Sequence, residues 1–335
     1  MKKIDSWLKN EFYISNVNLS VCRVFYSLTV LFYVVPTYIK HSHWLSNLPD
    51  ALYYPPPGPM MLLSGFFPDY VIYSLISLIT ALSVLLLLGK YTRSVSIMLG
   101  ISILLFDGNL YSIGKIDHGR ILLAWFPIIM SWSSWGSNLA VDKNTKSEHI
   151  YWPYQLFALL VAFGLFTAGL PKLLGGWLSF DTQASFSKFH TSYYALNRQD
   201  LLASSLISTG NLKYFWEFQD WFTVGFEVLF LASIVKEKIF KLFICLAVGF
   251  HWGVALTMNI VFPEQIIIYF MFVDWSTLAR HRVKFLLITT LLFSTHLLQI
   301  SFHGIDLFVW LLYIVSILVA LKILKSILPT SFVQS

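Results

Sequence analysis

Charged residues and cysteines are scarce in this sequence, and each shortage excludes a class of protein. Asp, Glu, Lys and Arg make up only 12% of the 335 residues, about half the share of an average soluble domain, which disfavours a water-soluble fold. The two cysteines, Cys22 and Cys245, lie inside apolar runs, which argues against a disulfide framework or a CxxC redox pair. HExxH and HxxxH spacings, a P-loop and a GxSxG elbow are also absent, so we expect no metal site.

Long apolar runs take the place of these features. Hydrophobic residues form 57% of the chain, and the mean hydropathy is +0.68. A membrane-spanning helix needs about 20 apolar residues, because each residue rises about 1.5 Å. We therefore predict an all-α, polytopic bundle of about ten transmembrane helices in the lipid bilayer of a cell membrane, the bacterial inner membrane. The predicted spans are 19–39, 70–88, 94–113, 118–135, 151–174, 217–235, 239–262, 264–279, 285–302 and 305–325.

The basic residues indicate the orientation, since Lys and Arg concentrate in cytoplasmic loops, and this explains the net charge of +6 without a nucleic-acid partner. The predicted topology has both termini in the cytoplasm and divides the chain into an amphipathic segment (1–18), a transmembrane domain (19–279) and two further helices with a tail (280–335). Arg23 lies within the first span, where we expect it to pair with a neighbouring helix or a lipid phosphate. The Lys and Arg residues predicted to be cytoplasmic, 15 of 23, are Lys2, Lys3, Lys9, Lys90, Arg93, Lys143, Lys146, Lys236, Lys238, Lys241, Arg280, Arg282, Lys284, Lys322 and Lys325.

Two long loops, 40–69 and 175–216, face the outside in this topology. Long loops gathered on one face commonly carry function. The first contains the string YYPPPGP from Tyr53 to Pro59, which predicts a stiff turn with no helical option. The second is predicted to hold a short interfacial helix around 182–194.

Ionisable groups inside apolar spans cost a few kcal/mol each, so each one is a functional candidate. Lys172 lies near the outer end of the fifth predicted span, in TAGLPKLLGGW, after a Gly and a Pro that loosen the helix. Partial desolvation there would favour the neutral amine, which could act as a base. The alternative is a lysine that anchors the helix end while its ammonium reaches water, and the residue taken alone favours this alternative.

The string GKIDHGR places Lys115, Asp117, His118 and Arg120 at the outer boundary of the fourth predicted span. A histidine beside a carboxylate can relay protons or hold a polar ligand. Asp117 can equally serve as the cap of a helix that starts there. Both interpretations stay open.

Two more ionisable groups lie deeper in predicted spans. Glu227 in the sixth span and His251 in the seventh are each about ten residues from the outer end, or roughly 15–17 Å deep. Adjacent antiparallel helices could bring them together, either as a proton relay or as a buried pair that fixes helix packing. Glu264, which follows Pro263, is better explained as the cap of the next helix.

Several strings in this chain resemble the horizontally transferred transmembrane family, whose membrane part is shared with vitamin K-dependent gamma-carboxylase. AGLPKLLGGW is the most specific of them, because a similar string in the carboxylases carries the lysine regarded as the base that deprotonates the reduced quinone. The pieces occur in the family's order over about residues 19–275. They are Arg23, YYPPPGPMMLL, NLYSIGKIDHGRILLAW, AGLPKLLGGW, Glu227 and FHWGVALTMNIVFPE.

The resemblance implies roles for particular residues. Lys172 occupies the place of the base, and His118 and His251 match histidines of the family. The residues expected beside a bound cofactor or substrate are Asp117, Arg120, Trp177 and Glu227. Two departures limit the likeness: two predicted spans stand where the carboxylase has a large soluble extracytoplasmic domain, and Pro171 replaces a second lysine. The resemblance therefore supports fold and site more than glutamate carboxylation.

Three functions compete at this point. The first is an intramembrane enzyme, a carboxylase/epoxidase-like lyase or a quinol-dependent oxidoreductase, in which Lys172 is a base toward an amphiphile and a reduced quinone is the cofactor suggested. The second is a proton-coupled transporter, or a protein that matures or exports a secreted antimicrobial peptide, with that peptide or a soluble extracytoplasmic protein as partner. The third, ranked lowest, is a scaffold whose polar residues only specify helix packing. The sequence does not identify the substrate.

Overall fold

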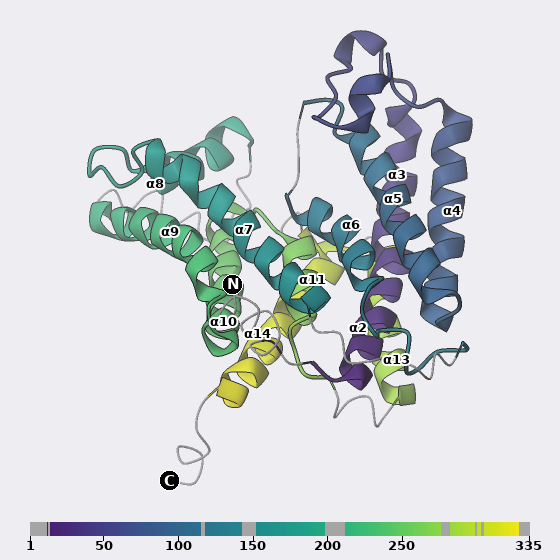
Figure 1. Ribbon diagram of the computed structural model, residues 1–335. Helices are drawn as coiled ribbons and strands as arrows, with labels where there is room; N and C mark the ends of the chain where they lie inside the picture. The colour runs from purple at the N-terminus through teal and green to yellow at the C-terminus, as the bar shows by residue number, and fades with distance from the viewer. Residues whose placement is uncertain are drawn as a thin grey trace, which may run out of the picture. The chain divides into compact units, whose positions relative to one another are not determined.

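The computed structural model describes residue 12 and residues 14–114, 118–142, 152–197, 212–275, 282–298, 300–302 and 305–327. Over these residues the fold is helical, apart from two short antiparallel strands, β1 (Ser301–Phe302) and β2 (Ile305–Asp306), and this confirms the expected all-α class (Figure 1). The chain divides into two compact units. Unit 1 is Met1–Phe157 with Asp274–Leu298, and unit 2 is Ala158–Val273 with Gln299–Ser335.

Six helices in the described ranges are long and apolar enough to cross a membrane. Four of these, α4, α7, α10 and α14, bury only 33–39% of their most apolar stretch, so most of that stretch faces outward. Helices that expose so much apolar surface are expected in contact with lipid, whereas in water the same surface would form large apolar patches that favour aggregation. The six are Asn16–Leu45, Asp69–Leu88 (α4), Thr92–Leu110 (α5), Trp152–Leu174 (α7), Glu237–Met258 (α10) and Leu307–Ile327 (α14).

The other four predicted spans correspond to helices that are shorter or more polar: α6 (His118–Met130), α9 (Lys213–Ser233), α11 (Pro263–Phe270) and α13 (Arg282–Ser294). α11 is only about 12 Å long. All residues over 266–273 are at most 2% exposed, so this apolar stretch is protein interior and not a lipid-facing span. The count of ten spans stays a prediction.

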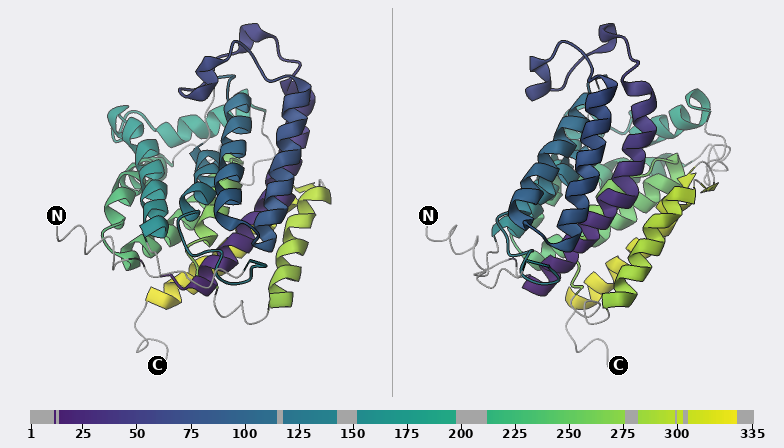
Figure 2. Two further views of the ribbon diagram at one scale, coloured as in Figure 1. Left: turned by 45° about the vertical axis from the view of Figure 1, so that its right-hand side comes forward. Right: turned by 90° about the vertical axis from the view of Figure 1, so that its right-hand side faces the viewer.

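In unit 1, α4 and α5 run side by side (Figures 1 and 2). α4 begins directly after Pro68 and ends at Gly89, whose left-handed backbone (φ 71°) lets its N–H bond back to the last turn of the helix. A side chain at residue 89 would also meet Arg23 Nη1 at 2.8 Å. Glycine is therefore required here both by the backbone and by the packing.

Arg23, on α2 (Asn16–Thr29), is fully buried, and its guanidinium is held by backbone carbonyls alone. The expected partner on a neighbouring helix is confirmed, because Leu86 and Leu87 belong to the end of α4, and the turn after α6 supplies the other acceptors. The carbonyl partners point their negative ends at the cation, as they do at a helix C-terminus. They are Trp135 (3.1 Å), Leu87 (3.0 Å), Asn138 (3.3 Å), Leu86 and Leu139.

The first long helix contains a π-helical turn, η1 (Val30–Val34), between α2 and α3 (Val35–Leu45). Pro36, the second residue of α3, has no N–H to bond to the carbonyl four residues earlier, and the wider turn lies directly before it. The helix therefore continues through the proline, and Tyr38 beyond it is fully buried.

The proline-rich loop has no helix from Tyr53 to Gly58, whereas its last residue, Pro59, begins a 3₁₀ turn that the prediction of no helical option had excluded. Tyr54 N donates to Ser112 O (2.6 Å), and Tyr53 Oη donates to Met60 O (2.6 Å). Short 3₁₀ turns flank it, at Asp50–Leu52 (η2) and Pro59–Leu62 (η3). The loop is thus fixed by its own hydrogen bonds and by the end of α5.

In unit 2, α8 (Ala184–His190) and the π turn η4 (Thr191–Ala195) confirm the helix predicted around 182–194, and α8 packs on α9. α10 and α14 pack against each other in antiparallel fashion. Cys245 Sγ contacts Ala320 O (3.4 Å), and Trp252 Nε1 donates to Tyr313 O (3.1 Å), so partners recede along α14 as α10 advances.

Candidate functional site

Lys172 and Glu227 form an ion pair between α7 and α9 in unit 2. Lys172 Nζ lies 2.5 Å from each carboxylate oxygen of Glu227. The Glu227 side chain is 4% exposed and that of Lys172 is 25% exposed, so the carboxylate is buried and the ammonium is only partly covered. The lysine is therefore neither a simple anchor in water nor an isolated buried amine.

Gly169 explains how the two helices approach closely enough for this pair. A Cβ at residue 169 would lie 2.6 Å from Glu227 Cβ and 3.0 Å from Val228 N, which is closer than real atoms allow. Gly169 is one turn before Lys172 on the same helix, so the contact of the two backbones and the ion pair share one face. Pro171 lies inside α7 between them.

His251 and Tyr269 form a second buried polar contact in the same unit. His251 Nε2 and Tyr269 Oη are 2.9 Å apart, and both side chains are buried. His251 Nδ1 is buried and has no hydrogen-bond partner within the described residues. Phe262 and Phe250 border the imidazole, with ring centroids 4.8 and 5.4 Å away.

These two contacts lie in the same unit: Lys172–Glu227 joins α7 to α9, and His251–Tyr269 joins α10 to α11. The sequence suggested a direct Glu227–His251 pair, but in the described contacts each residue has a different partner. The arrangement is a Lys–Glu pair beside a His–Tyr pair.

Trp177 lies beside Lys172, as expected of a residue near the site. Its ring centroid is 5.4 Å from Lys172 Nζ, within the range of a cation–π contact, and the backbone N–H of Trp177 donates to Lys172 O (3.2 Å). The ammonium thus lies near both an aromatic ring and a carboxylate.

Arg120 belongs to unit 1 and forms a separate polar cluster there. Its Nη1 lies 3.9 Å from Asp107 Oδ1, and its guanidinium lies 5.2 Å from the ring centroid of Tyr38. Tyr38 Oη donates to the same Asp107 oxygen (2.8 Å). Lys115 and Asp117 lie outside the described residues, and His118 begins α6 with a side chain that is likewise outside the description.

Sequence reasoning missed several polar residues of both units. Asp107 lies inside the predicted span 94–113, and an ionisable residue within an apolar span is a signal that could have identified it. Tyr269 gives no comparable signal, because tyrosine is ordinary in an apolar run. Asp220 accepts the N–H groups of Ala184 and Ser185 (both 2.8 Å) and so caps α8.

Glu217 is a further buried acid on α9. It is 3% exposed, and neither of its carboxylate oxygens has a hydrogen-bond partner in the part of the chain that the structure describes. Glu217, Asp220 and Glu227 recur at spacings of three and seven residues, which places them along one face of the helix. α9 therefore presents a stripe of buried carboxylates.

Chemically, the Lys–Glu and His–Tyr pairs can bind, hold and move protons. The described residues contain no group of three or more His, Cys, Asp or Glu side chains placed to bind a metal ion. Comparison with protein-family models, with curated proteins and with solved structures gives no match to this chain. The function must therefore be argued from the site itself.

Proposed function

We propose that the chain is a multi-pass membrane enzyme in which Lys172 is the base toward the hydroxyl group of an amphiphilic substrate. The observation that carries this proposal is the contact of Lys172 Nζ with both carboxylate oxygens of Glu227, at 2.5 Å, inside an apolar bundle. An ordinary anchoring lysine would extend to water, whereas this one is directed at a buried acid.

The ion pair offers a way to prepare the base. In a low-dielectric interior, an ammonium and a carboxylate in contact can exchange one proton: an Nζ–H bond breaks, an Oε–H bond forms, and the net charge stays zero. The neutral amine of Lys172 then takes the proton of a substrate hydroxyl, and the ammonium that forms lies beside the new oxyanion. Glu227 is in this scheme the residue that sets the protonation of Lys172.

The surroundings fit a reduced quinone or a similar aromatic amphiphile. His251 Nδ1, which is buried and has no hydrogen-bond partner among the described residues, is available to a polar group of a ligand. Trp177, Phe250 and Phe262 supply aromatic faces near Lys172 or His251. When bound, such a quinol would supply an acidic hydroxyl and reducing equivalents. We further propose that the likeness to the horizontally transferred transmembrane family reflects this shared chemistry.

The test is anaerobic binding of a short-chain reduced naphthoquinone to the purified protein, followed by ultraviolet-visible absorption. We expect the wild-type protein to produce the absorption of the deprotonated phenol, and Lys172→Met to abolish it. Lys188→Met, which alters an exposed lysine of unit 2, is the control and should behave as wild type. The proposal fails if Lys172→Met, folded to the same thermal stability, gives the wild-type spectrum.

Proton-coupled transport is the second candidate, and the carboxylate stripe of α9 favours it. Glu217 lies unpartnered on the same helix face as Glu227, as a group on a proton pathway would. Transport would be supported if a proton gradient drives the uptake of a solute into liposomes that contain the protein, and if Glu217→Gln abolishes this uptake. Quinol deprotonation without such uptake would support the enzyme.

We also propose the finer topology: ten spans in a cell membrane, both termini in the cytoplasm, and the Lys172 site toward the outer leaflet. The distribution of Lys and Arg supports it. A secreted peptide or a soluble extracytoplasmic protein is the partner we propose to meet the site from outside.

A further inference from the structure

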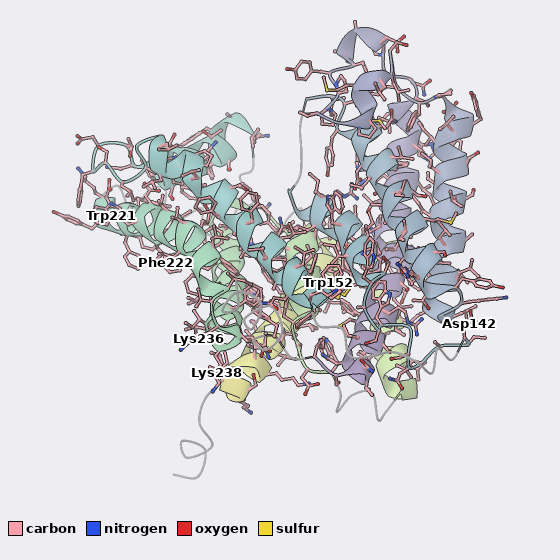
Figure 3. All side chains as sticks on the ribbon, viewed as in Figure 1. Asp142, Trp152, Trp221, Phe222, Lys236 and Lys238 are labelled. Atoms are coloured by element: carbon pink, nitrogen blue, oxygen red, sulfur yellow. The ribbon has the colours of Figure 1, made fainter. Side chains whose placement is uncertain are left out.

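The antiparallel packing of α10 and α14 brings together lysines that are about eighty residues apart in the sequence. Cys245 contacts Ala320. Because the helices are antiparallel, the residues before Cys245 and the residues after Ala320 lead to the same end of the pair, which consists of the first turn of α10 and the last turn of α14. Figure 3 shows Lys236 and Lys238 at this end, near the final turns of α14. We call the whole group the lysine patch: Lys236, Lys238, Lys241, Lys322 and Lys325.

The lysine patch has a strong positive charge. Four of its members are exposed, and the fifth, Lys241, is paired with Glu237 at 2.7 Å. Five lysines against this one glutamate leave four net positive charges. A concentration of charge this high attracts anions, most strongly at low ionic strength.

Exposed apolar side chains continue directly from the lysine patch along both helices. On α10, Leu242 (42% exposed) follows Lys238 by one turn, and Leu246 (39%) follows by another. On α14, Leu321 (51%) and Leu318 (63%) precede Lys325 at similar spacing. The lysines therefore stand at the edge of an apolar wall, where long side chains reach the head-group region while their stems cover apolar surface.

We propose that the lysine patch is a binding site for the head groups of anionic phospholipids, with the acyl chains lying along the apolar wall of α10 and α14. A soluble anion would use the charge alone, whereas a phospholipid matches both the charge and the adjoining apolar surface. The inference is independent of the chemistry at Lys172. Basic clusters next to a membrane helix attract anionic leaflets in this way, and each lysine near the surface contributes about fivefold to binding at low salt.

The test is a lipid titration of the full-length protein in a neutral detergent, measured by native mass spectrometry. We compare phosphatidylglycerol with phosphatidylcholine, for the wild type and for the variant Lys236→Gln/Lys238→Gln/Lys325→Gln. Phosphatidylglycerol should bind the wild type, and the triple variant should bind it about a hundredfold less tightly at low salt. Phosphatidylcholine should not distinguish the two.

The matched control carries the same change in charge at three exposed lysines that are not members of the patch: Lys40→Gln/Lys188→Gln/Lys213→Gln. It should bind phosphatidylglycerol as the wild type does. The proposal is overturned if both triple variants lose the same affinity, since net charge alone would then explain binding. It is equally overturned if the patch variant binds as the wild type, or if excess inorganic phosphate displaces the lipid completely.

Discussion

Replacement of Arg23 by Met tests how unit 1 is held together. The guanidinium donates to five backbone carbonyls, and removal of the side chain leaves all five without that partner. The carbonyls of Leu87, Asn138 and Leu139 belong to half-buried residues that water can reach, whereas Leu86 and Trp135 are at most 1% exposed. Leu86 O also accepts the N–H of Gly89 (3.0 Å), so among the described residues the oxygen left dry and without a donor is that of Trp135.

The magnitude follows from this one oxygen, because a buried acceptor left without a donor costs about 1–3 kcal/mol. Removal of a buried charge also recovers part of its desolvation cost, which offsets the loss. We expect Arg23→Met to lower the free energy of unfolding by about 1–2 kcal/mol.

The assay is reversible unfolding of the purified protein in mixed micelles, followed by tryptophan fluorescence. Arg93→Met, at an exposed position of α5, is the matched control and should change little. Arg23→Lys should lie between, because one ammonium keeps the charge but cannot contact both carbonyl segments. Equal stability of Arg23→Met and Arg93→Met would refute the reasoning, as would a fully stable Arg23→Lys.

Two further predictions concern α9 and are measured by the same unfolding assay. Gly169→Ala should destabilise the protein by about 1–3 kcal/mol, because the new methyl overlaps Glu227 and forces α7 away from α9. The control Gly225→Ala should not destabilise the protein, because a Cβ at residue 225 meets nothing within 4 Å. Similar losses of stability for both variants would contradict the close approach of the two helices. Glu217→Gln should leave stability unchanged or raise it by about 1 kcal/mol, since it replaces a buried carboxyl group for which the described residues offer no hydrogen-bond partner. Asp220→Asn keeps one acceptor oxygen but turns an NH2 donor toward the other backbone N–H, so it should cost about 1–3 kcal/mol. The reverse order of these two variants would show that Glu217 has a partner.

Much of the helical pattern could be predicted from hydropathy and from the residues that end helices. The span predicted at 70–88 is α4, Asp69–Leu88, because Pro68 and Gly89 mark its two ends. The prediction at 264–279 was less successful. Hydropathy reports an apolar environment and not its kind, and over 266–273 that environment is protein interior around a short helix and a turn.

The candidate site could be predicted only as single residues. Lys172, Glu227 and His251 stand out because an ionisable group in an apolar run is expensive. Their partners depend on how α7, α9, α10 and α11 pack, and one sequence carries no direct record of which helices touch. Gly169 illustrates this limit: its position in the string was noted, but its close approach to Glu227 required the structure.

The π turn at Val30–Val34 changes the direction in which the side chains after it point. An extra residue in a helix advances the phase of everything that follows by about 100°. The stretch beyond the turn thus presents Tyr38 to Asp107, where its hydroxyl finds an acceptor at 2.8 Å. In a regular α-helix without the π turn, the Tyr38 side chain would point about 100° away from this direction. Its hydroxyl would then miss Asp107, and a lipid acyl chain has no hydrogen-bond acceptor.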